Sequence, residues 1–355
     1  MKNLKIGDLT LTCPIIQGGM GVGISMSGLA SAVANEGGIG VIATAGVGIF
    51  EHDYHSNFLE ANLRALKKEI QKARELTNGI IGVNIMVALT YYADIVKTAI
   101  DEKIDVIFSG AGLPLNLPQF LTKDSNTKLV PIVSSARAVS VICNKWKNTY
   151  DYLPDAIVVE GPKAGGHLGF KKDQINDKEF SLENLLVEVI EKVKYFRDKY
   201  KKDIPVIAGG GIYTGSDIKK IMALGADGVQ MGTRFVTTDE CDASLKFKQA
   251  YIDCNLEDIE IIDSPVGMPG RAIKSEFISK VNNGEKKPVK CPYKCLHTCQ
   301  FETAPYCIAN ALANAMKGNF NSGFAFAGEN AYKSSKIISV KETIEEINKE
   351  FDEAN

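Results

Sequence analysis

The sequence predicts an α/β protein of the TIM (β/α)8 barrel class, with a C-terminal extension over the barrel mouth. The first observation is that eight short apolar runs recur along the chain, with segments of helical spacing between them. The second is that these runs are apolar almost throughout, which is typical of parallel strands covered on both faces. The eight predicted strands are Cys13–Ile16, Ile39–Ala43, Ile80–Met86, Val106–Ser109, Leu129–Ser134, Ala156–Glu160, Pro205–Gly209 and Gly228–Met231.

Apolar stripes predict the helices. Apolar residues recur at helical spacing from Leu59 to Ala73, between the second and third strands, and from Leu182 to Phe196, between the sixth and seventh. A doubly wound open sheet is the competing fold, but it usually carries its phosphate-binding glycines as G-x-G-x-x-G after the first strand. Here dense glycines also follow the late strands, which favours the barrel.

The chain divides into three predicted parts: a barrel over residues 1–254, an extension over 255–336 and a C-terminal helix over 337–355 that packs on the barrel. The extension breaks the alternation of strands and helices, since it holds SPVGMPGR, a charged stretch and a cluster of cysteines. Within it, SGFAFAGENAY (322–332) either lines a pocket at the barrel mouth or simply packs on the barrel.

Composition excludes several classes of partner. A formal net charge of -2, with Lys and Arg scattered along 355 residues, offers no basic surface to nucleic acid or to an anionic membrane. No apolar run reaches the roughly 18 to 20 residues that a membrane span needs. We therefore expect a soluble, cytoplasmic protein with reduced thiols, a small-molecule partner and, as an open option for assembly, a homodimer.

Glycines follow the last two predicted strands, in IPVIAGGGIYTGSDIKKIMALGADGVQMGTRF. Gly210 and Gly211 follow the seventh strand, and Gly232 and Thr233 follow the eighth. Glycines let backbone N–H groups converge on a phosphate, and barrels commonly bind phosphate at these two loops. The alternative is that these glycines only form tight turns between strand and helix.

The motif PIIQGGMGVG ends the first predicted strand. Gly18 and Gly19 allow a flat ring to approach the backbone, while Gln17 and Met20 offer a polar and an apolar contact. A flexible turn is the alternative interpretation. Asn84 ends the third strand, where asparagine is depleted, so its amide is a further candidate contact for the ring.

The loop VVEGPKAGGHLGF follows the sixth strand and carries His167 after Gly165 and Gly166. An imidazole with an ordinary pKa near 6.5 exchanges a proton close to neutrality. A loop histidine that only bonds the backbone is the alternative. Glu160 at the strand end is either a buried acid or a partner for the bound ring, and we favour the second.

PIIQGGM, GVNIM, EGPKAGGH, IPVIAGGGI and QMGTRF, in this order, resemble motifs of the nitronate monooxygenase (2-nitropropane dioxygenase) family, whose close relatives include FMN-dependent enoyl-ACP reductases. The resemblance covers about residues 10–240 and implies FMN at the barrel mouth, with His167 as the catalytic residue. The residues that it implies for FMN binding are Gln17, Gly18, Gly19, Met20, Asn84, Glu160, Gly165, Gly210, Gly211, Gln230, Met231, Gly232 and Thr233.

The chain departs from the family at two loop positions. The family loop often reads Q-G-x-E-A-G-G-H, whereas Glu160 and Lys163 stand here at the Gln and Glu positions. The substrate preference is therefore open. Because a carboxylate beside the flavin opposes negative charge on the reduced ring, we expect a shifted potential or a protonated Glu160.

Three functions follow from the resemblance and the motifs. The first is oxidation of alkyl nitronates with molecular oxygen. The alternative is enoyl-ACP (enoyl-thioester) reduction with NAD(P)H as co-substrate, with His167 donating the proton. The third is a non-catalytic protein that binds flavin or metal.

The extension carries four cysteines in CPYKCLHTCQFETAPYC, namely Cys291, Cys295, Cys299 and Cys307. Their spacing differs from the paired C-x2-C of zinc ribbons and from ferredoxin patterns, so we expect reduced structural thiols and no metal. An iron–sulfur or zinc site, or redox-active pairing, are the alternatives. One continuous helix would hold Cys291 and Cys299 about 12 Å apart, too far for one ion, whereas an irregular loop can gather all four.

Overall fold

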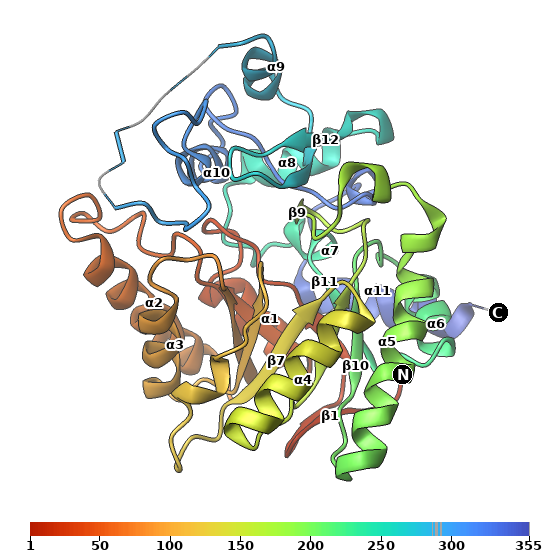
Figure 1. Ribbon diagram of the computed structural model, residues 1–355. Helices are drawn as coiled ribbons and strands as arrows, with labels where there is room; N and C mark the ends of the chain where they lie inside the picture. Colours follow the sequence, from red (N-terminus) through yellow and green to blue (C-terminus); the bar gives the residue numbers. More distant parts are fainter. Residues whose placement is uncertain (286, 288–289, 292, 355) are drawn as a thin grey trace.

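The computed structural model describes residues 1–285, 287, 290–291 and 293–354, and it confirms the predicted TIM barrel (Figure 1). Eight parallel strands follow one another around a closed barrel, and the last pairs with the first. Each corresponds to a predicted strand. The strands are β3 (Ile15–Gln17), β4 (Ile39–Ala43), β5 (Ile80–Met86), β6 (Val106–Gly110), β7 (Lys128–Val133), β8 (Ile157–Glu160), β10 (Val206–Gly209) and β11 (Gly228–Met231).

Helices cover the outside of the barrel. The two stripes predicted between strands form α2 and α5, and several helices begin at a hydroxyl side chain that accepts a backbone N–H bond, as Ser181 does for α5. None of the helices in the described ranges is both long and apolar enough to cross a membrane. The barrel helices are α1 (Ser27–Asn35), α2 (Phe58–Leu76), α3 (Tyr92–Asp101), α4 (Ala136–Tyr150), α5 (Leu182–Tyr200), α6 (Gly215–Ala223) and α7 (Thr233–Val236).

A two-stranded hairpin closes the amino end of the barrel. It consists of β1 (Leu4–Ile6) and β2 (Leu9–Leu11), and its apolar side chains join the core inside the barrel. Leu4 lies against Gly228, where β11 begins. Since this end is plugged, the carboxyl ends of the strands form the open mouth.

The segment after the barrel gathers at the carboxyl end of the strands (Figure 1). It contains α8 (Leu245–Asp253), the hairpin of β12 (Ile259–Asp263) and β13 (Pro269–Ile273), α9 (Glu276–Asn282) and α10 (Ile308–Met316). Strand β13 also pairs with β9 (Gly166–His167), the short strand that carries the predicted catalytic histidine. The predicted C-terminal helix is α11 (Val340–Glu353), which packs against α6, α1 and α7.

The barrel depends on close packing of α1 against β4, which generates a first prediction. A Cβ atom at Gly40 would lie 1.7 Å from the backbone oxygen of Ala30, and neither backbone can yield cheaply. Gly40→Ala should therefore destabilise the fold by about 3 kcal/mol or more. Gly18→Ala is the matched control, because its Cβ would meet only ordinary contacts at 3.5 Å. Thermal unfolding followed by circular dichroism measures both, and equal melting temperatures would contradict the packing described.

Candidate functional site

A cavity of about 540 Å³ opens at the carboxyl ends of all eight barrel strands. Residues far apart in the chain meet there because parallel strands all present their carboxyl ends at one side of the barrel. Of the residues proposed from the sequence, all except Gln17 line this cavity. They are Gly18, Gly19, Met20, Asn84, Glu160, Gly165, His167, Gly210, Gly211, Gln230, Met231, Gly232 and Thr233.

Gln17 lies inside the barrel wall instead of facing the cavity. Its side chain is fully buried, and its amide oxygen accepts a hydrogen bond of 2.9 Å from the N–H of Val41. Its amide nitrogen donates to the carbonyl oxygen of Gly18. The side chain thus ties β3 to β4 and orients the glycines that do reach the cavity.

Backbone donors converge at the ends of β10 and β11. Gly210 and Gly211 adopt φ values of 96° and 88°, a region that side chains disfavour. Among the residues that the structure describes, the N–H groups of Gly210, Gly211 and Gly232 have no hydrogen-bond acceptor. These three glycines are partly exposed at one cavity wall, where their N–H groups fit an anionic group such as a phosphate.

Glu160 is the last residue of β8, and it lines the cavity. Burial disfavours the ionised carboxylate and raises the pKa of Glu160 to about 7. A large share of this side chain is therefore neutral at physiological pH. Lys163 stands at the second loop position that differs from the family pattern. Its Nζ atom forms an ion pair of 3.0 Å with Glu329.

His167 faces the cavity from β9. Its Nε2 atom lies 2.7 Å from the Oγ atom of Ser264, and its ring meets the Phe326 ring edge-on at 4.9 Å between centroids. Burial disfavours the imidazolium and lowers the pKa of His167 to about 4, below the ordinary value expected from the sequence. The imidazole is therefore neutral at pH 7, and Ser264 restrains its orientation.

The extension holds the histidine loop in place. In the pairing of β13 with β9, Gly270 lies opposite His167, and the Leu168 N–H donates a bond of 2.9 Å to the carbonyl oxygen of Pro269. The Arg271 guanidinium donates to the carbonyl oxygen of Pro162 at 3.0 Å. Sequence reasoning missed Ser264 and Arg271, since no local pattern marks a contact between segments about a hundred residues apart in sequence.

An apolar wall continues the cavity away from the glycine loops. It includes Tyr54 and Tyr91 from the barrel loops, Leu296 from the extension, and Ile308 and Leu312 from α10. The two phenylalanines of the segment 322–332 occupy different environments. Phe326 lines the cavity, whereas Phe324 is fully buried in the core of the extension.

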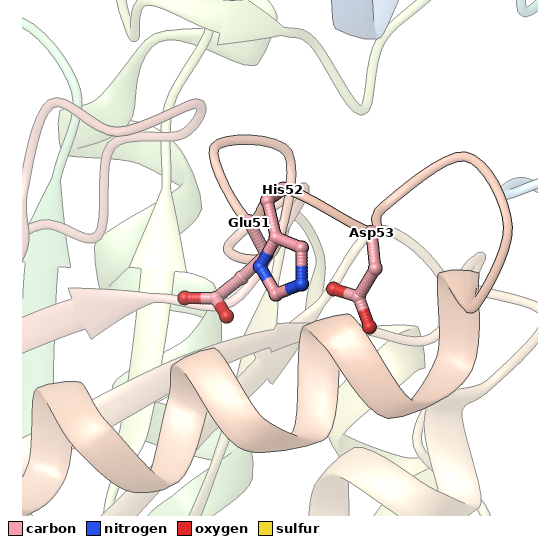
Figure 2. A group of neighbouring side chains, drawn as sticks. All are labelled: Glu51, His52 and Asp53. Atoms are coloured by element: carbon pink, nitrogen blue, oxygen red, sulfur yellow. The ribbon is translucent and has the colours of Figure 1, made fainter.

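One group of side chains outside the cavity has the spacing of metal ligands. Among the described residues, Glu51, His52 and Asp53 bring their ligand atoms within 4.8 Å of one another, and Figure 2 shows them on the loop before α2. Both carboxylates already pair with Arg64, at 2.8 Å for Glu51, and Lys68 adds a contact of 3.1 Å to Glu51. These cations lower the pKa of Glu51 and neutralise the charge that would attract a metal ion.

The family model and the similar sequences share one description. The sequence model of the family described as nitronate monooxygenase matches residues 2–350. A probable nitronate monooxygenase of Staphylococcus aureus (strain MSSA476) is 29% identical over 320 residues, which covers 80% of this chain and 81% of that protein. A probable nitronate monooxygenase of Staphylococcus saprophyticus is 27% identical over 346 residues, covering 88% and 85%.

Solved structures of similar fold cover almost the whole chain. FabK from Thermotoga maritima has a TM-score of 0.76 and 29% identity, with 97% of this chain and 94% of that chain covered. A nitroalkane oxidase from Streptomyces ansochromogenes has a TM-score of 0.71 and 22% identity, with 97% of both chains covered. The similarity to the nitroalkane oxidase supports the fold alone.

The raised pKa of Glu160 predicts a pH-dependent stability difference. The folded protein keeps this proton up to about pH 7, whereas the unfolded chain loses it near the ordinary value of 4.5. The carboxyl's contribution to stability is thus complete below pH 4.5 and is lost as pH rises through 7. The free energy of unfolding of Glu160→Gln, relative to that of wild type, should therefore rise by roughly 3 kcal/mol between pH 4 and pH 8. This corresponds to a few degrees in melting temperature.

Melting curves of the ligand-free protein at both pH values measure this difference. The exposed Glu345→Gln variant is the control for losing a carboxylate at the surface. A constant difference between Glu160→Gln and wild type would show that Glu160 ionises normally.

Proposed function

This chain belongs to the nitronate monooxygenase family and is an oxidoreductase, and from that premise we propose that it binds FMN in the barrel cavity and oxidises alkyl nitronates with molecular oxygen. The observation that carries the proposal is the shared cavity. Backbone N–H groups that have no acceptor among the described residues, and a neutral histidine, face the same space. The curated relatives named as probable nitronate monooxygenases support the choice of substrate.

The cavity residues fit FMN by their chemistry. The N–H groups of Gly210, Gly211 and Gly232 would hold the phosphate, while Gly18 and Gly19 leave the backbone open to a flat ring. The other predicted contacts, among them Asn84, Gln230 and Thr233, line the same walls. FMN when bound supplies the electron chemistry, and the protein supplies binding, orientation and proton control.

The state of His167 favours nitronate chemistry. Because burial disfavours the imidazolium, the role that suits this imidazole is to donate its single N–H to an oxygen of the nitronate. Ser264 holds the ring so that only one nitrogen remains for the substrate. The half-neutral Glu160 also lowers the repulsion that an anionic nitronate would meet in the cavity.

A second function has its own supporting observation. The apolar wall formed by Leu296, Ile308 and Leu312 offers a path for a long acyl chain. FabK from Thermotoga maritima is similar over almost the whole chain. The alternative is therefore reduction of an enoyl thioester with NAD(P)H as hydride source, in which His167 donates the proton.

Anaerobic stopped-flow spectroscopy separates the two functions. We expect rapid bleaching of the flavin absorbance by an alkyl nitronate and little response to NADH or NADPH. The reason is that a nitronate delivers electrons directly, whereas reduction of an enoyl thioester begins with hydride from a nicotinamide. Fast bleaching by NADH or NADPH with no response to the nitronate would reject nitronate oxidation.

Substitutions at His167 and at its hydrogen-bond partner Ser264 test the roles assigned to these two residues. His167→Ala should lower kcat by about 10²- to 10⁴-fold, the usual contribution of a positioned acid or base, with little change in FMN affinity. Ser264→Ala should lower kcat less and displace the pH profile of kcat/KM, because the ring loses its restraint. The control is Ser279→Ala on the exposed face of α9. Unchanged kcat in His167→Ala would remove this residue from the mechanism.

A further inference from the structure

The eight cysteines fall into two sets with different surroundings. The isolated cysteines, Cys13, Cys143, Cys241 and Cys254, are each at most 7% exposed, as expected for thiols that fill an apolar core. The four cysteines of the extension are only partly buried, and no disulfide joins cysteines in the described part of the chain. Core packing therefore explains the first set, whereas the second set stays partly exposed although Cys295 and Cys299 border the core.

Hydrogen bonds reach sulfur atoms in both sets. The sulfur atoms of Cys241 and Cys254 act as donors to the carbonyl oxygens of Ile24 and Tyr251. The Cys291 sulfur instead accepts a bond of 3.3 Å from the backbone N–H of Lys294. Backbone N–H groups also reach the sulfurs of Cys13 and Cys241. Such bonds favour the thiolate, the form in which cysteine binds metal.

The backbone brings the four cysteines to one place. No regular helix runs between α9 and α10 in the described residues, so the cysteines are not spread along one axis. Lys294 has a φ of 43°, which turns the chain between Cys291 and Cys295. The Lys287 N–H donates to the carbonyl oxygen of Pro305 at 2.6 Å, which brings the start of this segment beside Cys307.

The thiols lie close enough to act on one another electrostatically. The Cys295 sulfur lies near enough to the sulfurs of Cys291, Cys299 and Cys307 for electrostatic interaction. The Cys299 sulfur lies within the same range of the Cys291 and Cys307 sulfurs. A positively charged inorganic core stabilises thiolates that lie this close together.

The separation of the sulfur atoms favours one of two kinds of core. Four thiolates around one zinc ion, with bonds near 2.3 Å, must lie roughly 3.8 Å from one another. Within the described residues, no three of these sulfur atoms come within 4.8 Å of each other. In a polynuclear iron–sulfur cluster the thiolates bind different irons, so they are separated by the cluster itself.

We propose that Cys291, Cys295, Cys299 and Cys307 bind an iron–sulfur cluster at the rim of the barrel cavity. Cys295 and the adjoining Leu296 line that cavity, so the cluster lies beside the space assigned to the flavin and substrate. The Leu89–Leu296 bridge and the bond of 2.9 Å from the His297 N–H to the Ala88 oxygen attach this segment to the loop after β5. The site does not depend on which substrate the enzyme uses.

Metal and sulfide analysis of protein purified without oxygen tests the proposal. We expect at least about two iron atoms per chain with equal acid-labile sulfide, and a low-temperature electron paramagnetic resonance signal after dithionite reduction. Iron below about 0.2 atoms per chain after reconstitution with ferrous iron and sulfide would overturn it. About one zinc per chain with no iron would overturn the iron–sulfur assignment as well.

Substitutions assign the ligands. Cys295→Ser and Cys307→Ser should each lower the iron content at least about fivefold, whereas Cys254→Ser, at an isolated buried thiol, should leave it unchanged. Circular dichroism shows whether each variant is folded. Equal iron in wild type and both ligand variants would contradict the proposal.

A measurement on the unaltered chain covers the case in which the ligand variants fail to fold. In the native protein, iodoacetamide should leave the four extension cysteines unmodified until ferricyanide and EDTA remove the cluster, as mass spectrometry of peptides reports. Equal alkylation before and after this treatment would contradict the proposal. FMN content is measured separately, so failure of the cluster and failure of the proposed function are distinguishable.

Discussion

Closure of eight parallel strands is the constraint on which the rest of this molecule depends. It brings residues such as Met20, Glu160 and Gly232 to one mouth although they are far apart in the chain. The hairpin of β1 and β2 plugs the opposite end with apolar side chains, so only the carboxyl end remains open. Close contacts such as that of Gly40 with α1 hold the outer layer against this barrel.

The extension completes the site that the barrel begins. Strand β13 pairs with the short strand of His167, and Ser264 reaches the imidazole from the turn before β13. The same covering desolvates the cavity, which keeps His167 neutral and makes Glu160 harder to ionise. Fold and chemistry are therefore linked, because the segment that orients the histidine also sets its protonation state.

Much of this architecture could be predicted from the sequence because it rests on local patterns. Apolar runs marked the eight strands, and glycines at their ends marked the loops that line the cavity. Gln17 shows the limit, since its motif does not reveal that its amide bonds inside the barrel wall. The Ser264 contact and the pKa of His167 arise from packing between distant segments, which no local pattern encodes.

The proposed FMN site depends on backbone N–H groups at the ends of β10 and β11 that bind the phosphate. Titration of FMN into ligand-free protein, followed by flavin fluorescence, tests it most directly when FMN is compared with riboflavin, which lacks the phosphate. We predict one FMN per chain, bound at least about a hundredfold more tightly than riboflavin, because charge-assisted bonds to phosphate are strong. Equal affinity for both, or no binding of FMN, would contradict the account.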